Sequence, residues 1–429
     1  MSEIIEIRGG RPLKGTIQAS GAKNAALPML MATLLTPEPC ILRNVPNLLD
    51  TGLTLGLLEH FGANCSYSNS IAKICVPKLR ATEASYSLVK ALRASFWVLG
   101  PLLARGGAAR VALPGGDAIG TRPVDIHLKA LEKMGAEVKL KHGVVYATAP
   151  HGLHPAEIKF HFPSVGATHQ LMMAAALTPG ITTLSNVARE PEVSALADML
   201  NQMGAKIEGA GTDRIVIEGC SELTGVDVTM IGDRIEAGTY LMAAIATAGE
   251  ITITGINPEH LRAVLDLLVH MGVEVKTTTD SISVKTVSVP NAQKVTTQPF
   301  PGFPTDLQAP LMALLTIANG ESKIEEKIFE GRYGHVPELN RMGAKITVND
   351  REAIIEGVMK LSAAPVDGGD IRAAAALVVA GLAADGITQI HEIEHLRRGY
   401  ENLEQKFRSL GAQIGCVPEE IEDAVATGC

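Results

Sequence analysis

A glycine that follows an amphipathic segment and precedes an alternating one recurs six times along the 429-residue chain. The six copies read EHFGANCSY, EKMGAEVKL, NQMGAKIEG, VHMGVEVKT, NRMGAKITV and RSLGAQIGC, and their glycines are Gly62, Gly135, Gly204, Gly272, Gly343 and Gly411. Neighbouring copies lie 68 to 73 residues apart, which is long enough for one supersecondary unit each. The regular spacing predicts six copies of one structural unit that together span the chain.

Each unit has the patterns of two helices and a set of strands. The segment before the glycine, such as DIHLKALEKM, repeats apolar residues every three or four positions, so it predicts an amphipathic helix that ends at the glycine. The stretch after it, such as AEVKL, alternates and predicts a strand with one polar face. A second segment, such as THQLMMAAALTPG, is apolar nearly all round, which is typical of a buried helix. We therefore predict an α/β fold with helices inside and solvent-facing sheets outside, an inside-out α/β barrel.

The length of the chain exceeds what one hydrophobic core usually supports, so it predicts two domains of three units each. The boundary is expected near DVTMIGDRIEAG, where strands of the third unit give way to the apolar helix of the fourth. The first strand, IIEIRGG, precedes the first full unit and is predicted to complete the last one. The expected domains are residues 22–231, and residues 1–21 together with 232–429, with the active site in the cleft between them.

Composition excludes several partner classes. A formal net charge of −8 argues against nucleic acid and anionic membranes, because both need a basic surface. The apolar runs are shorter than the roughly 20 residues that cross a bilayer, and the start MSEIIEIRGG is unlike a secretory signal. Six cysteines without a CxxC pair fit a reducing cytoplasm. The oligomeric state is not set by the sequence.

The densest polar site is the loop LPGGDAIGTRPVDIH, which contains Asp117, Arg122 and Asp125. It is not a mononucleotide P-loop, because Thr121 and Arg122 stand where that loop needs Lys and Ser or Thr. A glycine-rich turn with solvated charges is the alternative for this loop taken alone. Its interpretation therefore depends on the polar residues of the other units.

Polar residues begin every predicted buried helix. Lys23 and Asn24 open the first one, where free N–H groups and the helix dipole attract anions; the alternative is a surface lysine beside an Asn N-cap. The other helix starts carry Arg93, Ser164, Asp233, Arg234, Asp306, Asp370 and Arg372. Capping accounts for the serine and the aspartates, but the dipole disfavours arginine there. With Arg332, Arg397 and Arg398 after later strands, these residues predict an anion-binding cleft.

One motif points elsewhere: His391, Glu392 and His395 spell HExxH, which in a helix binds zinc. The repeat aligns this stretch with strands of other units, so His391 is predicted to lie on a strand and the two histidines to lack a common helical face. We therefore expect neither a metal site nor a cofactor.

Taken together, SGAKNAALP, PGGDAIGTRPVD, SVGAT, NVAREPE, GTDRI, FPTD, HVPELNRMGA and RRGYE resemble the UDP-N-acetylglucosamine 1-carboxyvinyltransferase family of enolpyruvyl transferases, essentially end to end. The resemblance implies a two-domain fold of three units each. It implies transfer of enolpyruvyl from phosphoenolpyruvate to the 3′-hydroxyl of UDP-N-acetylglucosamine, with release of phosphate. It also implies a role in peptidoglycan synthesis, and hence in cell shape and division.

The resemblance assigns site residues by motif. Phosphoenolpyruvate binding is implied for Lys23, Asn24, Arg122 and Arg398, and nucleotide-sugar contacts for Arg93, Arg122, Pro123, Val124, Asp125, Ile126, Ser164, Val165, Gly166, Asp306 and Ile328. Catalytic roles are implied for Lys23, Asp117, Asp306 and Arg398, and supporting charge for Glu190, Arg332, Asp370 and Arg372. Asp117 is the expected proton donor on a mobile loop around 113–123, and Asp306 the carboxylate beside the attacking hydroxyl.

The chain departs from the family pattern at two places. Most members have cysteine where this chain has Asp117, and that cysteine is alkylated by the epoxide antibiotic fosfomycin, so we expect insensitivity to it. Phe162 and Pro163 stand where many relatives place a basic residue near the nucleotide. Two alternative functions stay open: the sister activity, 5-enolpyruvylshikimate-3-phosphate synthase, and a non-catalytic nucleotide-sugar-binding regulator.

Overall fold

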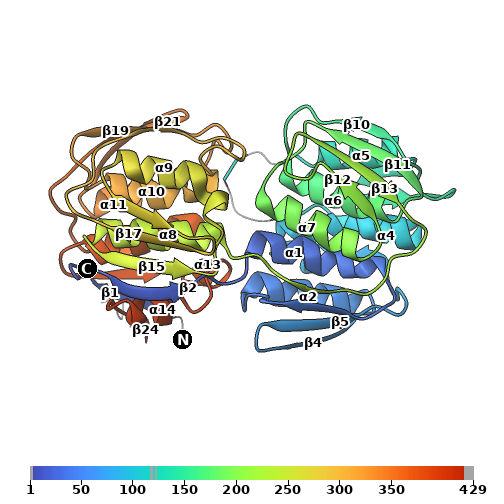
Figure 1. Ribbon diagram of the computed structural model, residues 1–429, viewed down its shortest axis with the longest axis horizontal. Helices are drawn as coiled ribbons and strands as arrows, with labels where there is room; N and C mark the ends of the chain where they lie inside the picture. The colour runs from blue at the N-terminus through green and yellow to red at the C-terminus, as the bar shows by residue number, and fades with distance from the viewer. Residues whose placement is uncertain (1–2, 116–118, 121–122, 420–429) are drawn as a thin grey trace, which may run out of the picture.

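The protein forms two halves of similar build, each with helices enclosed by strands (Figure 1). The structure is a computed structural model that describes residues 3–115, 119–120 and 123–419. Two hydrophobic clusters lie in it, one formed by buried side chains between Ala22 and Met230. The other is formed by side chains from Ile5 to Ala19 and from Ile235 to Ile414. Below, the N-terminal half means the elements around the first cluster and the C-terminal half those around the second.

The described residues form six four-stranded sheets, and each sheet has one parallel pair and two antiparallel pairs. In the N-terminal half the strand orders are β14(Asp227–Thr229)-β3(Cys40–Arg43)-β5(Ile71–Cys75)-β4(Asn64–Ser68), β6(Glu83–Ala84)-β7(Ala108–Ala112)-β9(Val144–Thr148)-β8(Glu137–Lys141) and β10(Glu157–Lys159)-β11(Gly180–Ser185)-β13(Arg214–Gly219)-β12(Lys206–Glu208). In the C-terminal half they are β16(Glu274–Thr277)-β17(Ser281–Lys285)-β15(Glu250–Thr254)-β2(Lys14–Gln18), β18(Lys294–Thr296)-β19(Glu321–Glu325)-β21(Glu352–Glu356)-β20(Lys345–Asn349) and β22(Pro365–Asp367)-β23(Ile387–His391)-β1(Glu3–Arg8)-β24(Gln413–Pro418).

Two kinds of helix fill each half. The inner helices are α1 (Lys23–Ala32), α4 (Leu99–Gly106), α6 (Val165–Ala176), α8 (Arg234–Ala246), α10 (Gln308–Leu315) and α12 (Ile371–Ala383). All 13 residues of α8 are buried, and α8, α10 and α12 pack on one another, as expected for helices that are apolar all round. The amphipathic helices are α2 (Leu49–His60), α5 (Asp125–Lys133), α7 (Pro191–Gln202), α9 (Arg262–His270), α11 (Val336–Arg341) and α14 (Leu403–Ser409).

Short helical turns complete the units: α3 (Tyr86–Val89), α13 (Glu394–Arg397), and the 3₁₀ turns η1 (Thr33–Leu35), η2 (Arg93–Val98), η3 (Pro258–Leu261) and η4 (Thr305–Leu307). Arg93 therefore begins a 3₁₀ turn and not the buried α-helix that the sequence predicted. Pro101 lies in the helix that follows and lacks the N–H that would bond the Trp97 carbonyl, which favours the tighter turn ahead of it.

The six motif glycines follow the amphipathic helices, as predicted, and their φ angles lie between +88° and +116°. Only glycine adopts this conformation freely, so each one ends its helix and turns the chain into the next strand. The alternating burial of the strands leaves polar side chains on the outer sheet faces, as in KITVN of β20. The repeat therefore fixes the same helix end in all six units.

The first two strands belong to the C-terminal half. β1 pairs with β23 and β24, so the prediction that the first strand completes the last unit is confirmed, and β2 pairs with β15. Figure 1 shows these blue strands within the half that is otherwise yellow to red. The chain crosses between the halves twice, and the two crossing segments touch through an antiparallel bridge between Gly21 and Gly232.

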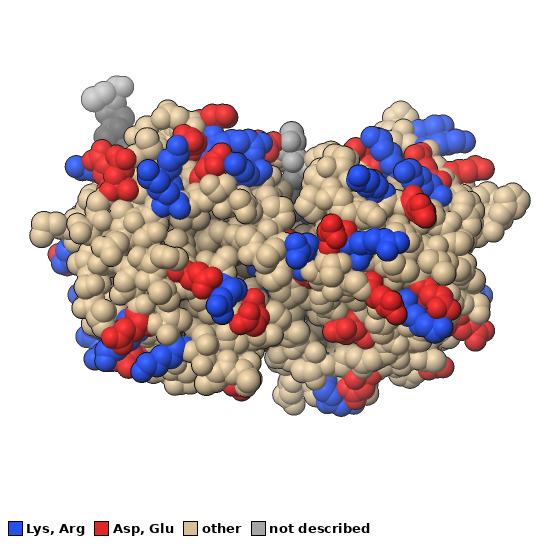
Figure 2. Space-filling view, turned by 45° about the horizontal axis from the view of Figure 1, so that its top comes forward, with Lys and Arg blue, Asp and Glu red and all other residues tan. Residues whose placement is uncertain are grey.

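On the outside, basic and acidic side chains are interspersed over both halves, which meet along a furrow (Figure 2). No helix in the described part of the chain is long and apolar enough to span a bilayer.

Candidate active site

Ionisable side chains from both halves meet where the halves face each other. One group, here the Asp50 cluster, consists of Lys23, Asp50 and Arg398. Lys23 is the first residue of α1, Asp50 lies in the first turn of α2, and Arg398 follows α13. The first two belong to the N-terminal half and the third to the C-terminal half. The Asp50 cluster therefore joins the halves.

The cations of the Asp50 cluster lie within ion-pair distance of its carboxylate, and its side chains are mostly shielded from solvent. Lys23 Nζ lies 2.7 Å from Asp50 Oδ2, and Arg398 Nε lies 2.9 Å from Asp50 Oδ1. The Asp50 side chain is 1% exposed and that of Lys23 is 10% exposed, which excludes the alternative of a surface lysine. Burial lowers the pKa of Lys23, and the charges of Arg372 and Arg398 act in the same direction, while Asp50 opposes the shift.

The helix start of Lys23 also has a partner outside its own helix. The N-cap residue of α1 is Ala22, whose side chain makes no capping bond, so the Asn N-cap of the alternative interpretation is not found. Asp233 Oδ2, from the second crossing segment, accepts the Lys23 N–H at 3.0 Å. Asn24 instead donates its side-chain N–H to Asp306 Oδ2 at 3.4 Å, across the boundary between the halves.

A second group, here the Asp306 cluster, consists of Asp306, Arg332 and Arg372, all from the C-terminal half. Asp306 Oδ1 lies 2.8 Å from Arg332 Nη1, and its Oδ2 lies 3.0 Å from Arg372 Nη2. Burial by itself raises the pKa of the Asp306 carboxyl, but Arg372 and Arg332 outweigh burial and hold the pKa well below its usual range. The carboxylate therefore stays ionised.

Asp306 corrects one sequence prediction. It lies inside η4 and does not cap a helix, because both of its oxygens bind the two arginines. Ser164, Asp233 and Asp370 do cap α6, α8 and α12 with their side chains, as predicted. The arginines at helix starts have carboxylate partners: Arg372 pairs with Asp306, and Arg234 with Glu192.

The pair of Arg234 and Glu192 is a further buried contact between the halves. Its Nε–Oε1 distance is 3.0 Å, and the side chains are 7% and 3% exposed. Beside it, Glu190 accepts the Phe300 N–H of the other half at 3.4 Å. Burial raises the pKa of Glu190, although Arg234 opposes the shift. Glu190 thus lies at the boundary, as its predicted supporting role requires.

The expected nucleotide-sugar residues of the N-terminal half gather around the starts of α5 and α6. A side chain at Gly166 would place Cβ 2.6 Å from Trp97 Nε1, so only glycine fits against the indole. Burial lowers the pKa of His127 in α5 to about 4, and the charge of Arg93 acts in the same direction. Val124, Asp125 and Ile126 begin α5, where Asp125 pairs with Lys129 at 3.1 Å, and Ser164 and Val165 begin α6. Pro123 precedes them on the surface.

Glu326 fixes the backbone at Ile328, which is expected to contact the nucleotide sugar. Its Oε1 accepts the N–H groups of Ile328 and Phe329 at 2.8 and 3.0 Å. Its Oε2 accepts the hydroxyl of Thr305, the neighbour of Asp306, at 2.9 Å. Glu326 is fully buried and ties this loop to the Asp306 cluster.

Asp117 and Arg122 lie outside the described residues. Between them, Ile119 and Gly120 contact the C-terminal half: the Ile119 carbonyl accepts the Gly331 N–H at 3.0 Å. A side chain at Gly120 would place Cβ 2.7 Å from the Glu330 carboxyl carbon. This part of the loop therefore lies next to Arg332.

The HExxH residues lie on two elements. His391 ends β23, as predicted, and its Nδ1 lies 2.8 Å from Glu419 Oε1, whereas His395 lies in α13. Within the described ranges, no three His, Cys, Asp or Glu residues come together as a metal-binding group.

Asp50, Glu192 and Glu326 were missed by the sequence analysis. A signal existed for the first two, since the amphipathic helices α2, α5 and α7 each carry an acid in their first turn, at Asp50, Asp125 and Glu192. Glu326 has no such signal, because its role depends on backbone N–H groups that the fold brings to it.

The chain matches the family described as EPSP synthase (3-phosphoshikimate 1-carboxyvinyltransferase) over residues 7–407. The UDP-N-acetylglucosamine 1-carboxyvinyltransferase of Trichlorobacter lovleyi is 51% identical over 419 residues, covering 98% of this chain and 100% of that protein. The protein of the same name from Thermotoga petrophila is 47% identical, covering 96% of this chain and 99% of that protein.

Solved structures agree in fold. The enolpyruvyl transferase NikO from Streptomyces tendae superposes with a TM-score of 0.86 at 28% identity, covering 97% of this chain and 99% of that one. EPSP synthase from Acinetobacter baumannii superposes with a TM-score of 0.74 at 17% identity, covering 97% and 100%, which supports the fold alone. The predicted two-part α/β fold of repeated units is that of these enzymes. The chain therefore belongs to the EPSP synthase family of enolpyruvyl transferases, and within it to the UDP-N-acetylglucosamine 1-carboxyvinyltransferases.

Proposed function

We propose that this enzyme transfers the enolpyruvyl group of phosphoenolpyruvate to the 3′-hydroxyl of UDP-N-acetylglucosamine and releases phosphate. The observation that carries the proposal is the meeting, between the two halves, of cations and carboxylates that suit a small, multiply charged anion. The acceptor follows from relatives at about half identity over nearly the whole chain, which bear that activity in their names. The product enters peptidoglycan precursor synthesis, which links the enzyme to cell shape and division.

Phosphoenolpyruvate is bound in this proposal by Lys23, Asn24, Arg122 and Arg398. Lys23 and Arg398 both contact Asp50, at 2.7 and 2.9 Å. The phosphate and carboxylate of the substrate present the same kind of oxygen that Asp50 presents, so the substrate competes with Asp50 for these two cations. An anion beside Lys23 also favours its charged form, which burial disfavours.

The reaction requires an acid and a base on opposite sides of the alkene. In the addition step, the 3′-oxygen bonds to C2 of phosphoenolpyruvate while C3 takes a proton from Asp117. In the elimination step, C3 returns a proton to the Asp117 carboxylate and the bond from C2 to the phosphate oxygen breaks, which restores the alkene and releases phosphate.

Asp306 acts on the attacking hydroxyl. Its two arginines keep it ionised, so it accepts a hydrogen bond from the hydroxyl and orients the oxygen toward C2. The hydroxyl becomes more acidic as its oxygen bonds to carbon, and the carboxylate then receives or relays its proton. Arg332 and Arg372 are supporting charges that hold Asp306 in this orientation.

The nucleotide sugar is bound in this proposal by Arg93, residues 122–126, residues 164–166, Asp306 and Ile328. The starts of α5 and α6 present the positive ends of helix dipoles, which favour the diphosphate. The domain division 22–231, and 1–21 with 232–429, is part of the proposal, and the separation of the two hydrophobic clusters supports it. We also propose that the enzyme works in the cytoplasm, where both substrates are made.

The deciding experiment measures phosphate release without added metal, from phosphoenolpyruvate plus UDP-N-acetylglucosamine and, in parallel, from phosphoenolpyruvate plus shikimate 3-phosphate. Release with the nucleotide sugar alone is the expected result. Release with shikimate 3-phosphate alone would assign the sister activity, and binding of the nucleotide sugar without release would assign a binding protein.

Insensitivity to fosfomycin is a further part of the proposal, because the carboxylate of Asp117 is a weaker nucleophile than a thiolate. The unmodified enzyme should keep its activity after incubation with fosfomycin, and Asp117→Cys should become inactivated by it while retaining turnover. A covalent adduct on Asp117, detected by mass spectrometry, would contradict this part.

A further inference from the structure

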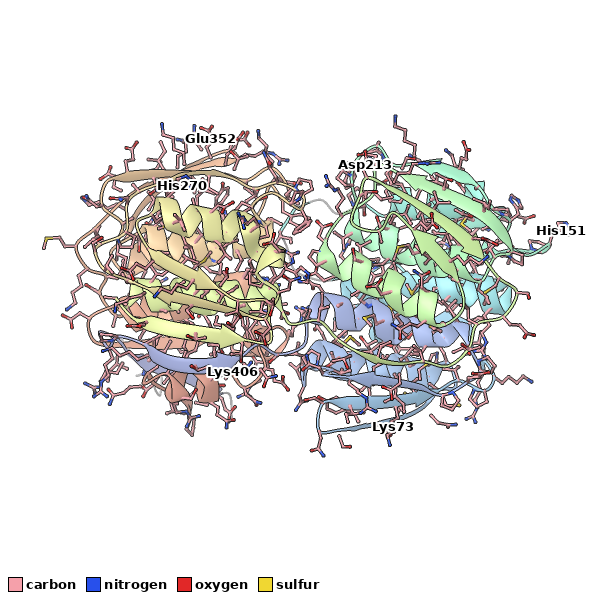
Figure 3. All side chains as sticks on the ribbon, viewed as in Figure 1. Lys73, His151, Asp213, His270, Glu352 and Lys406 are labelled. Atoms are coloured by element: carbon pink, nitrogen blue, oxygen red, sulfur yellow. The ribbon has the colours of Figure 1, made fainter. Side chains whose placement is uncertain are left out.

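A partly buried ion pair, with Lys406 17% exposed, lies directly behind the first crossing segment, outside the two clusters. Glu236, the third residue of α8, is 2% exposed, and its Oε1 lies 2.6 Å from Nζ of Lys406 in α14. Figure 3 labels Lys406 below the strand β2, near the place where the chain passes between the halves. Burial raises the pKa of the Glu236 carboxyl, and Lys406 opposes that shift.

Both members of the pair hold Ser20, which lies in the first crossing segment. Glu236 Oε2 accepts the Ser20 N–H at 2.6 Å, and Lys406 Nζ donates to the Ser20 hydroxyl at 2.7 Å. The Ser20 hydroxyl also lies 3.3 Å from Glu236 Oε1. Ser20 is thus hydrogen-bonded to both the carboxylate and the ammonium group of the pair.

Lys23 follows Ser20 by three residues, and hydrogen bonds to the second crossing segment fix the backbone between them. The Ser20 carbonyl accepts the Asp233 N–H at 2.8 Å, and the Ile231 carbonyl accepts the Ala22 N–H at 2.8 Å. The Lys23 N–H itself donates to Asp233 Oδ2 at 3.0 Å. A shift of Ser20 is therefore transmitted to the start of α1 and to the Lys23 side chain.

An ion pair with a buried carboxylate adds little net stability compared with well-packed apolar side chains, because the carboxylate loses its hydration. Stability alone is therefore a weak reason for this pair. We propose that Glu236 and Lys406 are positioning residues, which fix Ser20 so that Lys23 meets Arg398 of the other half in the geometry that phosphoenolpyruvate needs. The inference rests on the proposed function and extends it to two residues that do not contact the substrate.

The test compares Glu236→Gln and Lys406→Met with Lys406→Arg, which restores the charge. The matched control is Lys285→Met, which removes the exposed Lys285–Glu250 pair at 3.3 Å in the same half. Phosphate release gives kcat and KM for phosphoenolpyruvate. Fluorescence of Trp97, which is the single tryptophan of the sequence and lies beside Gly166, gives the Kd of UDP-N-acetylglucosamine.

We expect Glu236→Gln and Lys406→Met to lower kcat/KM for phosphoenolpyruvate by about tenfold to a hundredfold, the usual effect of misplacing a substrate-binding group. The Kd of the nucleotide sugar should change by less than about twofold, because most of the residues proposed to bind it lie in the N-terminal half, around the starts of α5 and α6. Lys406→Arg should recover most of the activity. If Glu236→Gln does not fold, the comparison of Lys406→Met with Lys406→Arg tests the inference. Unchanged kcat/KM, or equal losses for both ligands that follow the fall in Tm, would overturn the inference. An unmodified enzyme that releases no phosphate would instead overturn the proposed function, and this inference with it.

Discussion

The Asp50 cluster and the Asp306 cluster have the same composition type, one carboxylate between two cations, but they are built differently. The Asp50 cluster takes its carboxylate from one half and one of its cations from the other, so it exists only while the halves are together. The Asp306 cluster lies within the C-terminal half and is complete without the other half. Only Asn24, which reaches Asp306 at 3.4 Å, connects the second cluster to the N-terminal half among the bonds described above.

The difference separates two tasks. A carboxylate whose partners come from both halves links the approach of the halves to the binding of an anion. In the proposed function, a substrate anion replaces Asp50 as the common partner of Lys23 and Arg398. A carboxylate fixed by two arginines of one half is oriented before substrate arrives, which favours a role in the chemical step. The predictions below test this separation.

The largest effect is expected for Asp306→Asn. The amide cannot accept a proton, and it leaves Arg332 and Arg372 buried without a counter-charge, so kcat should fall by about a thousandfold. Nucleotide-sugar affinity, followed by Trp97 fluorescence, should change much less. A kcat within about tenfold of the parent would remove Asp306 from the chemical step.

Asp50→Asn should have a smaller effect on turnover and a larger effect on stability. It leaves the buried Lys23 and the partly buried Arg398 without the carboxylate that they share. Tm should therefore fall by several degrees and kcat/KM for phosphoenolpyruvate by about ten- to a hundredfold. Inorganic phosphate should restore much of the lost Tm, since it supplies the missing negative charge.

The matched comparison is Asp306→Asn, for which phosphate should restore less, and the control is Glu83→Gln, which removes the exposed Glu83–Arg110 pair at 3.2 Å. Equal rescue of both cluster variants by phosphate would contradict the separation of the two tasks.

Asn24→Ala should cost less than either carboxylate. It removes one hydrogen bond of 3.4 Å to a charged acceptor, which corresponds to a fall of about three- to tenfold in kcat/KM. Tm should stay within about two degrees of the parent, because the contact is only partly buried. A loss above about a hundredfold would mean that Asn24 also contacts the reacting atoms.

The smallest effect on turnover is expected at His335, where the prediction concerns stability and pH. His335 is buried next to Arg332, and burial lowers its pKa to about 3, with the Arg332 charge acting in the same direction. The unfolded chain binds this proton near pH 6.5, so neutral His335 contributes stability that is complete above that pH and is lost as pH falls toward 3. The slope of the unfolding free energy against pH is proportional to the number of protons taken up on unfolding. His335→Leu should lower that number by about one between pH 6.5 and 4, so stability should fall less steeply. A denaturant titration at several pH values measures this slope, and an unchanged slope would exclude His335 as its source.

Much of the fold was predictable because its signals are local and repeated. The motif glycines end helices through their own backbone conformation, and the apolar helices are buried because every side of them is apolar. Strand β1 was assigned to the last unit because it precedes the first full unit, and its pairing with β23 and β24 agrees. Arg93 was less predictable, since the effect of Pro101 on the preceding turn competes with the helical pattern.

The candidate site was predictable only in part. Lys23, Asp306 and Arg398 stand in motifs specific enough for the resemblance to assign them roles. Asp50 and Glu326 stand in no such motif, and their functions arise from partners far away in the sequence. The distance from Asp50 to its partner Arg398 is 348 residues along the chain.

The sequence by itself determined the six-fold repeat, the burial of the apolar helices and the residue types able to hold a phosphorylated anion, because each depends on neighbours a few residues apart. The tertiary structure decided which charges pair, that Asp306 binds arginines and does not cap a helix, and that Glu236 and Lys406 hold the crossing segment. Ion pairing depends on distances of about 3 Å between side chains, and only the packing of the two halves sets those distances.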